Sequence, residues 1–162
     1  MRLTRRLRGK FNFTEGLISV TDPCYDSDTW CRLDNIKVIP GTYKCISYVV
    51  PKEGSGQWDA GRTMIAQICL EGHNSPQQNA KRKRLGSIGV DAGLAGFYQN
   101  KPDYTSEEWS NFCDSFYDSK GNDKGYLITE HGFCTSSGYG DGEYDVYAYE
   151  CKDGIYCVEI EF

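Results

Sequence analysis

The chain has 162 residues, of which 39% are apolar and 25% are charged, and its formal net charge at pH 7 is −5. These values are typical of a globular protein and exclude disordered, collagen-like and coiled-coil chains. No apolar run approaches the ~20 residues that cross a bilayer as a helix, so we expect no association with a membrane. The length predicts one domain, which we place at residues 11–162, after a basic segment at residues 1–10.

Charge is distributed unevenly along the chain. Residues 1–100 hold 14 Lys and Arg against 9 Asp and Glu, whereas residues 101–162 hold 4 against 14. This balance disfavours specific nucleic-acid binding, which needs a basic surface, and it favours head-to-tail association into a homo-oligomer. Two basic clusters, Met1–Lys10 and Lys81–Arg84, can contact phosphates or an acidic partner, but we favour a solvated tail and a solvated loop.

The cysteines are interpreted as free thiols. The basic segment is not followed by the ~7–15 apolar residues of a secretory signal, so we expect the protein to stay in the cytoplasm. In a reducing compartment disulfides are rare, and several of these cysteines are expected to be small buried apolar residues. The sequence contains no Cys-x-x-Cys pair. The eight cysteines are Cys24, Cys31, Cys45, Cys69, Cys113, Cys134, Cys151 and Cys157.

Residues 11–100 have mainly β character. Runs of apolar, β-branched and aromatic residues between turn signals predict strands there. In chain order these strands are Phe11–Val20, Ile36–Ile39, Thr42–Val50, Thr63–Leu70 and Ser87–Tyr98, the last of which is interrupted by glycines. The polar stretch Gly72–Arg84 is predicted to be an exposed loop.

One helix is predicted over about residues 105–118. Thr105 and Glu108 have the spacing of a capping box, in which each side chain accepts a hydrogen bond from the other residue's backbone amide. An apolar stripe follows at helical spacing, which predicts packing of one helix face against a sheet. The stripe consists of Trp109, Phe112, Cys113, Phe116 and Tyr117.

The chain ends in a predicted β-hairpin. Tyr144–Tyr149 and Ile155–Phe162 are predicted strands, and Asp153-Gly154 between them is a strong hairpin-turn signal. Together these elements predict a mainly β, α+β fold. Its architecture is an antiparallel β-sheet or sandwich with one amphipathic helix.

Three short segments place an Asp beside residues that allow tight backbone turns. Glycine permits positive φ and close approach, and proline fixes φ. The segments are Thr21–Tyr25, Val90–Gly96 and Ser136–Gly142. If Asp22, Asp91 and Asp141 converge, their carboxylates can bind a hard cation or act as an acid–base pair. The alternative, which we favour for any single Asp, is that each one accepts hydrogen bonds within its own turn.

Aromatic side chains and a glycine-rich loop suggest a binding site. A pocket lined by Trp and Tyr rings beside Arg62 suits a nucleotide or a protein surface, and glycine-rich backbone amides can hold an anion. The rings expected near turns or on outer strand faces are Tyr25, Trp30, Trp58, Tyr98, Tyr104, Tyr139 and Tyr147. The residues predicted to bind a ligand are Asp22, Cys24, Tyr25, Trp58, Arg62, Asp91, Gly93, Ser136, Ser137, Gly138, Tyr139, Gly140, Asp141 and Tyr144.

No catalytic residue, metal ligand or cofactor is predicted. Cys24 needs a base to act as a nucleophile. The only histidines are His73 and His131, and we disfavour a pair of Cys24 with His131. Metal-binding and serine-nucleophile motifs are absent from the sequence.

The same segments resemble an uncharacterised family of bacterial and phage proteins, the domain of unknown function 4241. The resemblance rests on Val20–Tyr25 (VTDPCY), Gly89–Phe97 (GVDAGLAGF) and, most specifically, Ser137–Tyr147 (SGYGDGEYDVY). Small size, a basic amino end and many cysteines also resemble a phage or prophage protein. The family brings no established activity, so the resemblance supports the fold and the choice of motifs.

These observations favour a non-catalytic phage or prophage protein that binds a small ligand or a host protein in the cytoplasm of its bacterial host. A nucleotide immune signal is one such ligand, and its capture would counter host defence. The alternative is a metal-assisted hydrolase of a nucleotide or phosphoester that uses Asp22, Asp91 and Asp141 with Mg²⁺ or Mn²⁺. A third hypothesis is a structural component of a phage.

Overall fold

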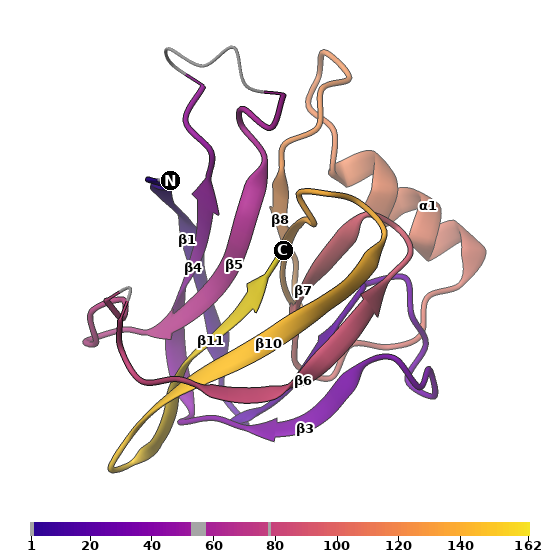
Figure 1. Cartoon of the computed structure of the whole chain (residues 1–162). Helices are drawn as coiled ribbons and strands as arrows, with labels where there is room; N and C mark the ends of the chain where they lie inside the picture. Colours follow the sequence, from indigo (N-terminus) through magenta and orange to yellow (C-terminus); the bar gives the residue numbers. More distant parts are fainter. Residues whose placement is uncertain (1, 53–57, 78) are drawn as a thin grey trace.

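A computed structural model describes residues 2–52, 58–77 and 79–162 (Figure 1). The fold is mainly β, with 50% of the described residues in strands and 6% in helix. The helix is α1 (Ser106–Ser115), and the strands are β1 (Thr4–Phe13), β2 (Leu17–Thr21), β3 (Leu33–Lys37), β4 (Gly41–Val49), β5 (Thr63–Leu70), β6 (Lys83–Val90), β7 (Leu94–Tyr98), β8 (Tyr126–Ile128), β9 (Gly132–Ser136), β10 (Gly142–Cys151) and β11 (Gly154–Glu161).

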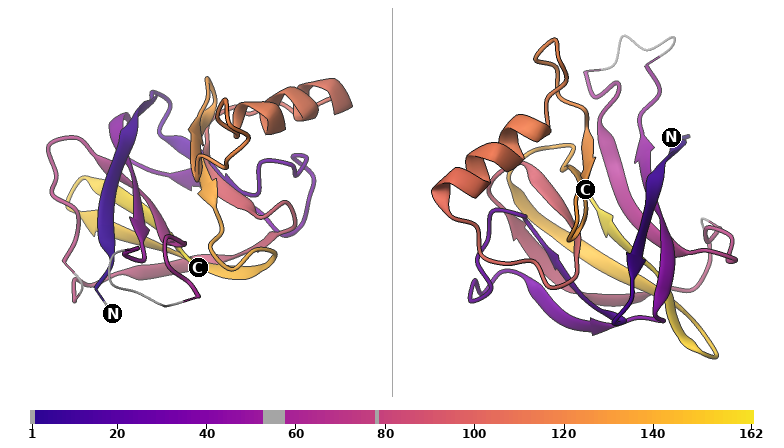
Figure 2. Two further views of the ribbon diagram at one scale, coloured as in Figure 1. Left: turned by 90° about the horizontal axis from the view of Figure 1, so that it is seen from above. Right: turned by 180° about the vertical axis from the view of Figure 1, so that it is seen from behind.

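The strands of the described residues form two antiparallel sheets (Figures 1 and 2). The six-stranded sheet has the order β1-β4-β5-β11-β10-β6, and the five-stranded sheet has the order β3-β2-β7-β9-β8. Antiparallel neighbours such as β10 and β11 are joined by the predicted turn at Asp153-Gly154. The prediction of a β-rich α+β fold with antiparallel sheets and one helix is confirmed.

Side chains from both sheets form the main apolar core. Phe13 and Tyr43 of the six-stranded sheet and Phe97 and Phe133 of the five-stranded sheet are fully buried in it. Successive residues of a strand point to opposite faces, so each strand contributes alternate residues to this core. Burial of apolar surface, at ~25 cal/mol per Å², is the main favourable contribution to folding.

The helix α1 packs on the outer face of the five-stranded sheet (Figure 2). Both hydrogen bonds of the predicted capping box between Thr105 and Glu108 are present. Phe112 and Phe116 are buried against Tyr98, so the predicted stripe does contact a sheet. The helix ends at Ser115, earlier than predicted. Within the described residues, no helix has the length and apolar character of a membrane span.

Two predicted strands are each two strands in the structure. Phe11–Val20 breaks at Gly16, and Ser87–Tyr98 breaks at Gly93. These glycines have φ values of 64° and 67°, a left-handed conformation that a strand cannot contain. At each break the chain passes from one sheet to the other, from β1 to β2 and from β6 to β7. The prediction of one strand over Phe11–Val20 is therefore wrong, whereas Ser87–Tyr98 was expected to be interrupted by glycines and is divided at Gly93.

The basic residues near the amino terminus belong to a strand. β1 pairs with β4 along its whole length, from Thr4 opposite Val49 to Phe13 opposite Gly41. The interpretation of this cluster as a solvated tail is wrong, and the boundary that we placed after residue 10 falls inside a strand. β1 is an edge strand, where charged side chains are tolerated because one side faces solvent. The second basic cluster is also partly structured, since β6 begins at Lys83.

All eight cysteines are free thiols in the structure. Cys45, Cys69, Cys134 and Cys157 are fully buried, in agreement with their interpretation as small apolar residues.

Candidate functional site

The three predicted Asp segments lie together. Oδ2 of the buried Asp22 accepts hydrogen bonds of 2.7 Å from the backbone amides of both Asp91 and Ala92. Oδ1 of Asp141 accepts a hydrogen bond of 3.0 Å from the backbone amide of Gly93. The turn between β6 and β7 is therefore bound from one side by the segment after β2 and from the other by the segment before β10.

Two of these carboxylates bind backbone amides of a neighbouring segment. Oδ1 of Asp22 also accepts a 2.9 Å hydrogen bond from the amide of Cys24, within its own turn. The favoured interpretation of separate local turns is thus incomplete, because Asp22 and Asp141 join different segments. Among the described residues, no three His, Cys, Asp or Glu side chains are grouped as a metal site requires.

Cys24 and Tyr25 lie beside these carboxylates. Burial raises the pKa of the Cys24 thiol, and its hydrogen bond to Asp22 raises that pKa further. Burial also raises the pKa of the Tyr25 hydroxyl, as does the neighbouring Cys31. Because the thiolate is the nucleophilic form of cysteine, this environment opposes nucleophilic catalysis by Cys24. The imidazole of His131 instead lies 3.6 Å from the carboxylate of Glu130.

The glycine-rich segment Ser136–Gly142 is fixed against the start of β5. The hydroxyls of Ser137 and Tyr144 donate hydrogen bonds of 2.6 and 2.8 Å to the carbonyl of Gly140. Gly138 has a φ of 63°, and a Cβ at this position would lie 2.1 Å from the carbonyl oxygen of Thr63. Only glycine allows both this conformation and this contact.

Trp58, Arg62 and Tyr139 form an exposed group, which we call the ring cluster. The Trp58 and Tyr139 ring centroids are 5.7 Å apart, and the Arg62 guanidinium carbon lies 5.3 Å from the Trp58 centroid. Arg62 also donates a hydrogen bond to the carbonyl of Gly138. Trp58 is 73% exposed and Tyr139 is 43% exposed. The predicted association of rings with Arg62 occurs here, whereas Tyr98 is not available to a ligand because α1 buries it on the outer face of the five-stranded sheet.

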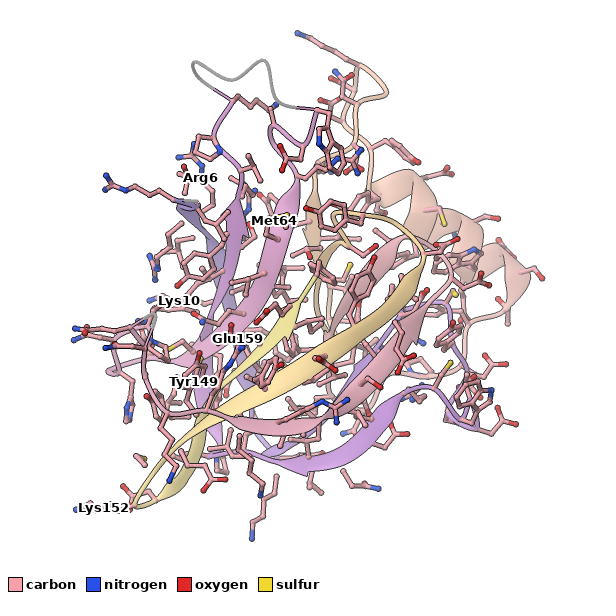
Figure 3. All side chains as sticks on the ribbon, viewed as in Figure 1. Arg6, Lys10, Met64, Tyr149, Lys152 and Glu159 are labelled. Carbon is pink, nitrogen blue, oxygen red and sulfur yellow. The ribbon has the colours of Figure 1, made fainter. Side chains whose placement is uncertain are left out.

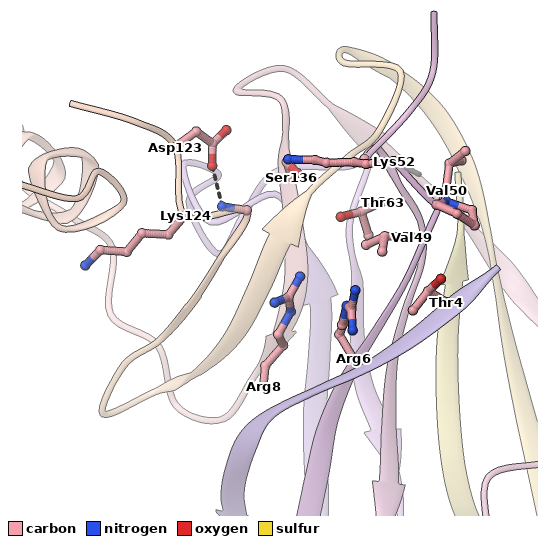
Figure 4. A pocket seen from close by; sticks show the side chains of 13 residues that line it. Thr4, Arg6, Arg8, Val49, Val50, Lys52, Thr63, Asp123, Lys124 and Ser136 are labelled. Atoms are coloured by element: carbon pink, nitrogen blue, oxygen red, sulfur yellow. Dashed lines mark hydrogen bonds between the residues drawn. The ribbon is translucent and has the colours of Figure 1, made fainter. Parts of the chain in front are cut away.

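A cleft of about 760 Å³ opens between the two sheets beside these segments (Figure 4). We call it the intersheet cleft. Arg6 and Arg8 of β1 extend into it side by side (Figure 4). Arg6 pairs with Ser47 of β4, and paired residues of antiparallel strands lie on the same face of their sheet. For these two residues it is the face turned toward the five-stranded sheet, so Arg6 faces the space between the sheets. Gly125 and Ser136 line the cleft from the side of the five-stranded sheet.

The intersheet cleft is positively charged. Nε of Arg8 donates a 2.8 Å hydrogen bond to the hydroxyl of Ser47, and its guanidinium carbon lies 4.7 Å from the Tyr126 centroid. Burial lowers the pKa of Arg8, Tyr126 partly offsets this, and the charge of Arg6 lowers the pKa again. Among the described residues that line the cleft, Asp123 is the one acidic residue, and its carboxylate accepts a hydrogen bond from the amide of Gly125. Two guanidinium groups held together in a cleft favour an anion.

The cleft and the ring cluster share two segments of the chain. Gly61 and Thr63 line the cleft, and Arg62 between them belongs to the ring cluster. Ser136 lines the cleft and begins the segment that carries Tyr139. The two features are therefore adjacent along the chain.

Arg6 and Arg8 were not among the site residues predicted from the sequence. They are two residues apart, as side chains on one face of a strand are, and this spacing was the available signal. Of the predicted residues, Asp22 and Asp141 hold the loops, and Arg62 and Tyr139 lie in the ring cluster.

Comparisons with protein-family models, curated proteins and solved structures gave no match. The resemblance to the domain of unknown function 4241 family therefore stays a prediction.

Proposed function

We propose that this chain is a non-catalytic binding protein that captures a small anionic ligand carrying a planar ring, of which a nucleotide is the best example. The observation that carries the proposal is the pair Arg6 and Arg8 in the intersheet cleft, next to the exposed ring cluster. The pair supplies the charge for a phosphate group, and the cluster supplies surfaces for a base.

The dimensions and chemistry of the site support this ligand class. Small-molecule sites have volumes of roughly 300–1,000 Å³, and the intersheet cleft has about 760 Å³. Guanidinium groups bind phosphate oxygens in pairs of charge-assisted hydrogen bonds. Stacking of one base on an aromatic side chain contributes roughly 1–3 kcal/mol.

The non-catalytic part of the proposal is supported by the way in which the candidate catalytic groups are used. Asp22 accepts three hydrogen bonds from backbone amides, and Asp141 accepts one. The raised pKa of Cys24 keeps its thiol protonated. Metal-assisted hydrolysis at these carboxylates would require Asp22 to release the amides that fix the turn between β6 and β7.

The family resemblance extends this proposal to a biological role. In a phage or prophage protein, the captured nucleotide would be an immune signal of the bacterial host, and its removal in the host cytoplasm would weaken host defence. Capture of a host protein is the alternative outcome if nucleotides fail to bind.

The test is calorimetric titration of the whole chain with cyclic AMP, a cyclic dinucleotide, ADP and pyrophosphate. We expect at least one nucleotide to bind saturably and more tightly than pyrophosphate. Arg6→Ala and Trp58→Ala are each expected to weaken that binding by about tenfold or more.

Arg5→Ala is the matched control. Arg5 is the neighbour of Arg6 on β1, and it lies opposite Tyr48 on the other face of the sheet, where its guanidinium contacts Ser75. We expect this variant to bind within about threefold of the wild-type affinity, because the overall charge change is screened. Equal losses for Arg5→Ala and Arg6→Ala, or no saturable binding of any nucleotide, would contradict the proposal.

A further inference from the structure

The outer face of the six-stranded sheet carries a second cleft, of about 640 Å³, which we call the outer-face cleft. It lies on the face that points away from the core. Glu159 of β11 lines it and pairs with Gln67 of β5, whereas the next residues, Val158 and Ile160, point into the core. Figure 3 shows Glu159 and Tyr149 on this face of the sheet.

The carboxylate of Glu159 is incompletely bonded. Glu159 is 3% exposed, and its Oε1 is buried with no hydrogen-bond partner in the described structure. Its other oxygen lies 3.9 Å from Nη1 of Arg82. That guanidinium is engaged elsewhere, because it lies 2.6 Å from the carboxylate of Glu161 and 3.6 Å from the ring centroid of Tyr147.

The surroundings of Glu159 do not compensate for its burial. Burial raises the pKa of Glu159, and the opposing effects of Tyr149, Arg82 and Gln67 leave it raised. A buried carboxylate oxygen without a donor is costly, and native proteins rarely leave such an atom unbonded. The missing partner is a hydrogen-bond donor, and a positively charged donor suits a carboxylate best.

We propose that the outer-face cleft binds a cationic nitrogen on an apolar stem, an alkylguanidine or alkylamine, whose N–H groups donate to Glu159. Leu3 and Ile65 line the same cleft and supply apolar surface for the stem. This inference goes beyond the proposed function, because it concerns the opposite face of the sheet and a ligand of opposite charge. The two can fail independently.

The test titrates n-butylguanidine into the whole chain by calorimetry, with n-butylurea as a neutral ligand of the same shape. We expect saturable binding of n-butylguanidine, with n-butylurea weaker by about tenfold or more, as for the loss of one charge-assisted hydrogen bond. N-acetylarginine-N-methylamide separates two sources of the cation, since its binding would indicate an arginine side chain of a peptide. Absence of saturable binding by both guanidines would overturn the proposal.

Glu159→Gln keeps the shape of the side chain and removes its charge. We expect it to weaken n-butylguanidine binding by about tenfold or more. Glu143→Gln, which removes an exposed carboxylate of β10 that is not among the residues lining the cleft, is the matched control and should change binding by less than about threefold. A folded Glu159→Gln protein that binds with wild-type affinity would also overturn the proposal. If Glu159→Gln does not fold, the comparison of n-butylguanidine with n-butylurea on the wild-type protein still tests the proposal.

Discussion

The backbone amide of Asp91 donates a 2.7 Å hydrogen bond to the buried carboxylate of Asp22. This bond joins the end of β2 to the turn at which the chain passes from β6 in the six-stranded sheet to β7 in the five-stranded sheet. Hydrogen bonds within the protein therefore fix these loops in the absence of a ligand. A binding surface that is fixed before the ligand arrives loses less entropy on binding.

Replacement of Asp22 should destabilise the protein strongly. Asp22→Ala removes the acceptor of three backbone amides, so we expect a loss of about 2–4 kcal/mol in the free energy of unfolding. Asp22→Asn keeps one carbonyl oxygen and should lose less. Urea denaturation measures both. Asp91→Ala is the control, since the side chain of Asp91 is exposed, and we expect a change below about 0.5 kcal/mol. Equal effects of Asp22→Ala and Asp91→Ala would show that the carboxylate does not hold the turn.

Two glycines of one loop provide a matched pair of substitutions. Both have positive φ, but a Cβ at Gly138 would lie 2.1 Å from the carbonyl oxygen of Thr63, whereas a Cβ at Gly140 would have nothing within 4 Å. Gly140→Ala should cost about 1–2 kcal/mol through backbone strain alone. Gly138→Ala should cost at least about 1 kcal/mol more, because backbone must move.

Gly138→Ala should also weaken nucleotide binding, since the carbonyl of Gly138 accepts the hydrogen bond of Arg62. Urea denaturation and calorimetry of the two variants check these expectations. A Gly138→Ala protein as stable as Gly140→Ala would mean that the loop does not pack against β5 as described.

Stability should depend on pH through Glu159. Its raised pKa means that the folded state binds the proton more tightly than the unfolded state, so the stabilisation is complete below the ordinary pKa of 4.5 and is lost as pH rises through the raised value. The Glu159→Gln side chain does not ionise, so this variant does not lose stability in the same way as pH rises. We expect its melting temperature to exceed that of the wild type near neutral pH, by about 2–4 °C for each kcal/mol, and the difference to shrink near pH 4.

Thermal melts of the wild type, Glu159→Gln and Glu161→Gln at both pH values make this measurement. The Glu161→Gln control breaks a half-exposed ion pair with Arg82, so its effect should be within about 1 kcal/mol. A Glu159→Gln protein that melts below the wild type near neutral pH would show that the buried carboxylate is stabilising.

Local signals in the sequence predicted several elements correctly. The strand Thr63–Leu70 agrees with β5, the capping box at Thr105 is formed, and the Asp153-Gly154 turn joins β10 to β11. These elements depend on residues close together in the chain. The strand break at Gly16 was missed because a single glycine within an apolar run is also compatible with a continuous strand.

The candidate site was only partly predictable. The convergence of the segments of Asp22, Asp91 and Asp141 was one of two hypotheses, and spacing along the chain cannot decide between them. The structure brings the segments together through hydrogen bonds from backbone amides of one segment to Asp carboxylates of another, and spacing along the chain does not indicate such pairs. Arg6 and Arg8 were missed because the basic cluster Met1–Lys10 was interpreted as a solvated tail, although their spacing of two residues fits one face of a strand.

The most direct test of the central claim is an NMR titration of the isotopically labelled chain with the tightest nucleotide of the calorimetric panel. The account predicts saturating chemical-shift changes at the backbone amides of Arg6, Arg8, Gly61 and Ser136, and at the indole N–H of Trp58. Changes confined to the outer face of the six-stranded sheet, around Tyr149, or no saturating change at all, would contradict it.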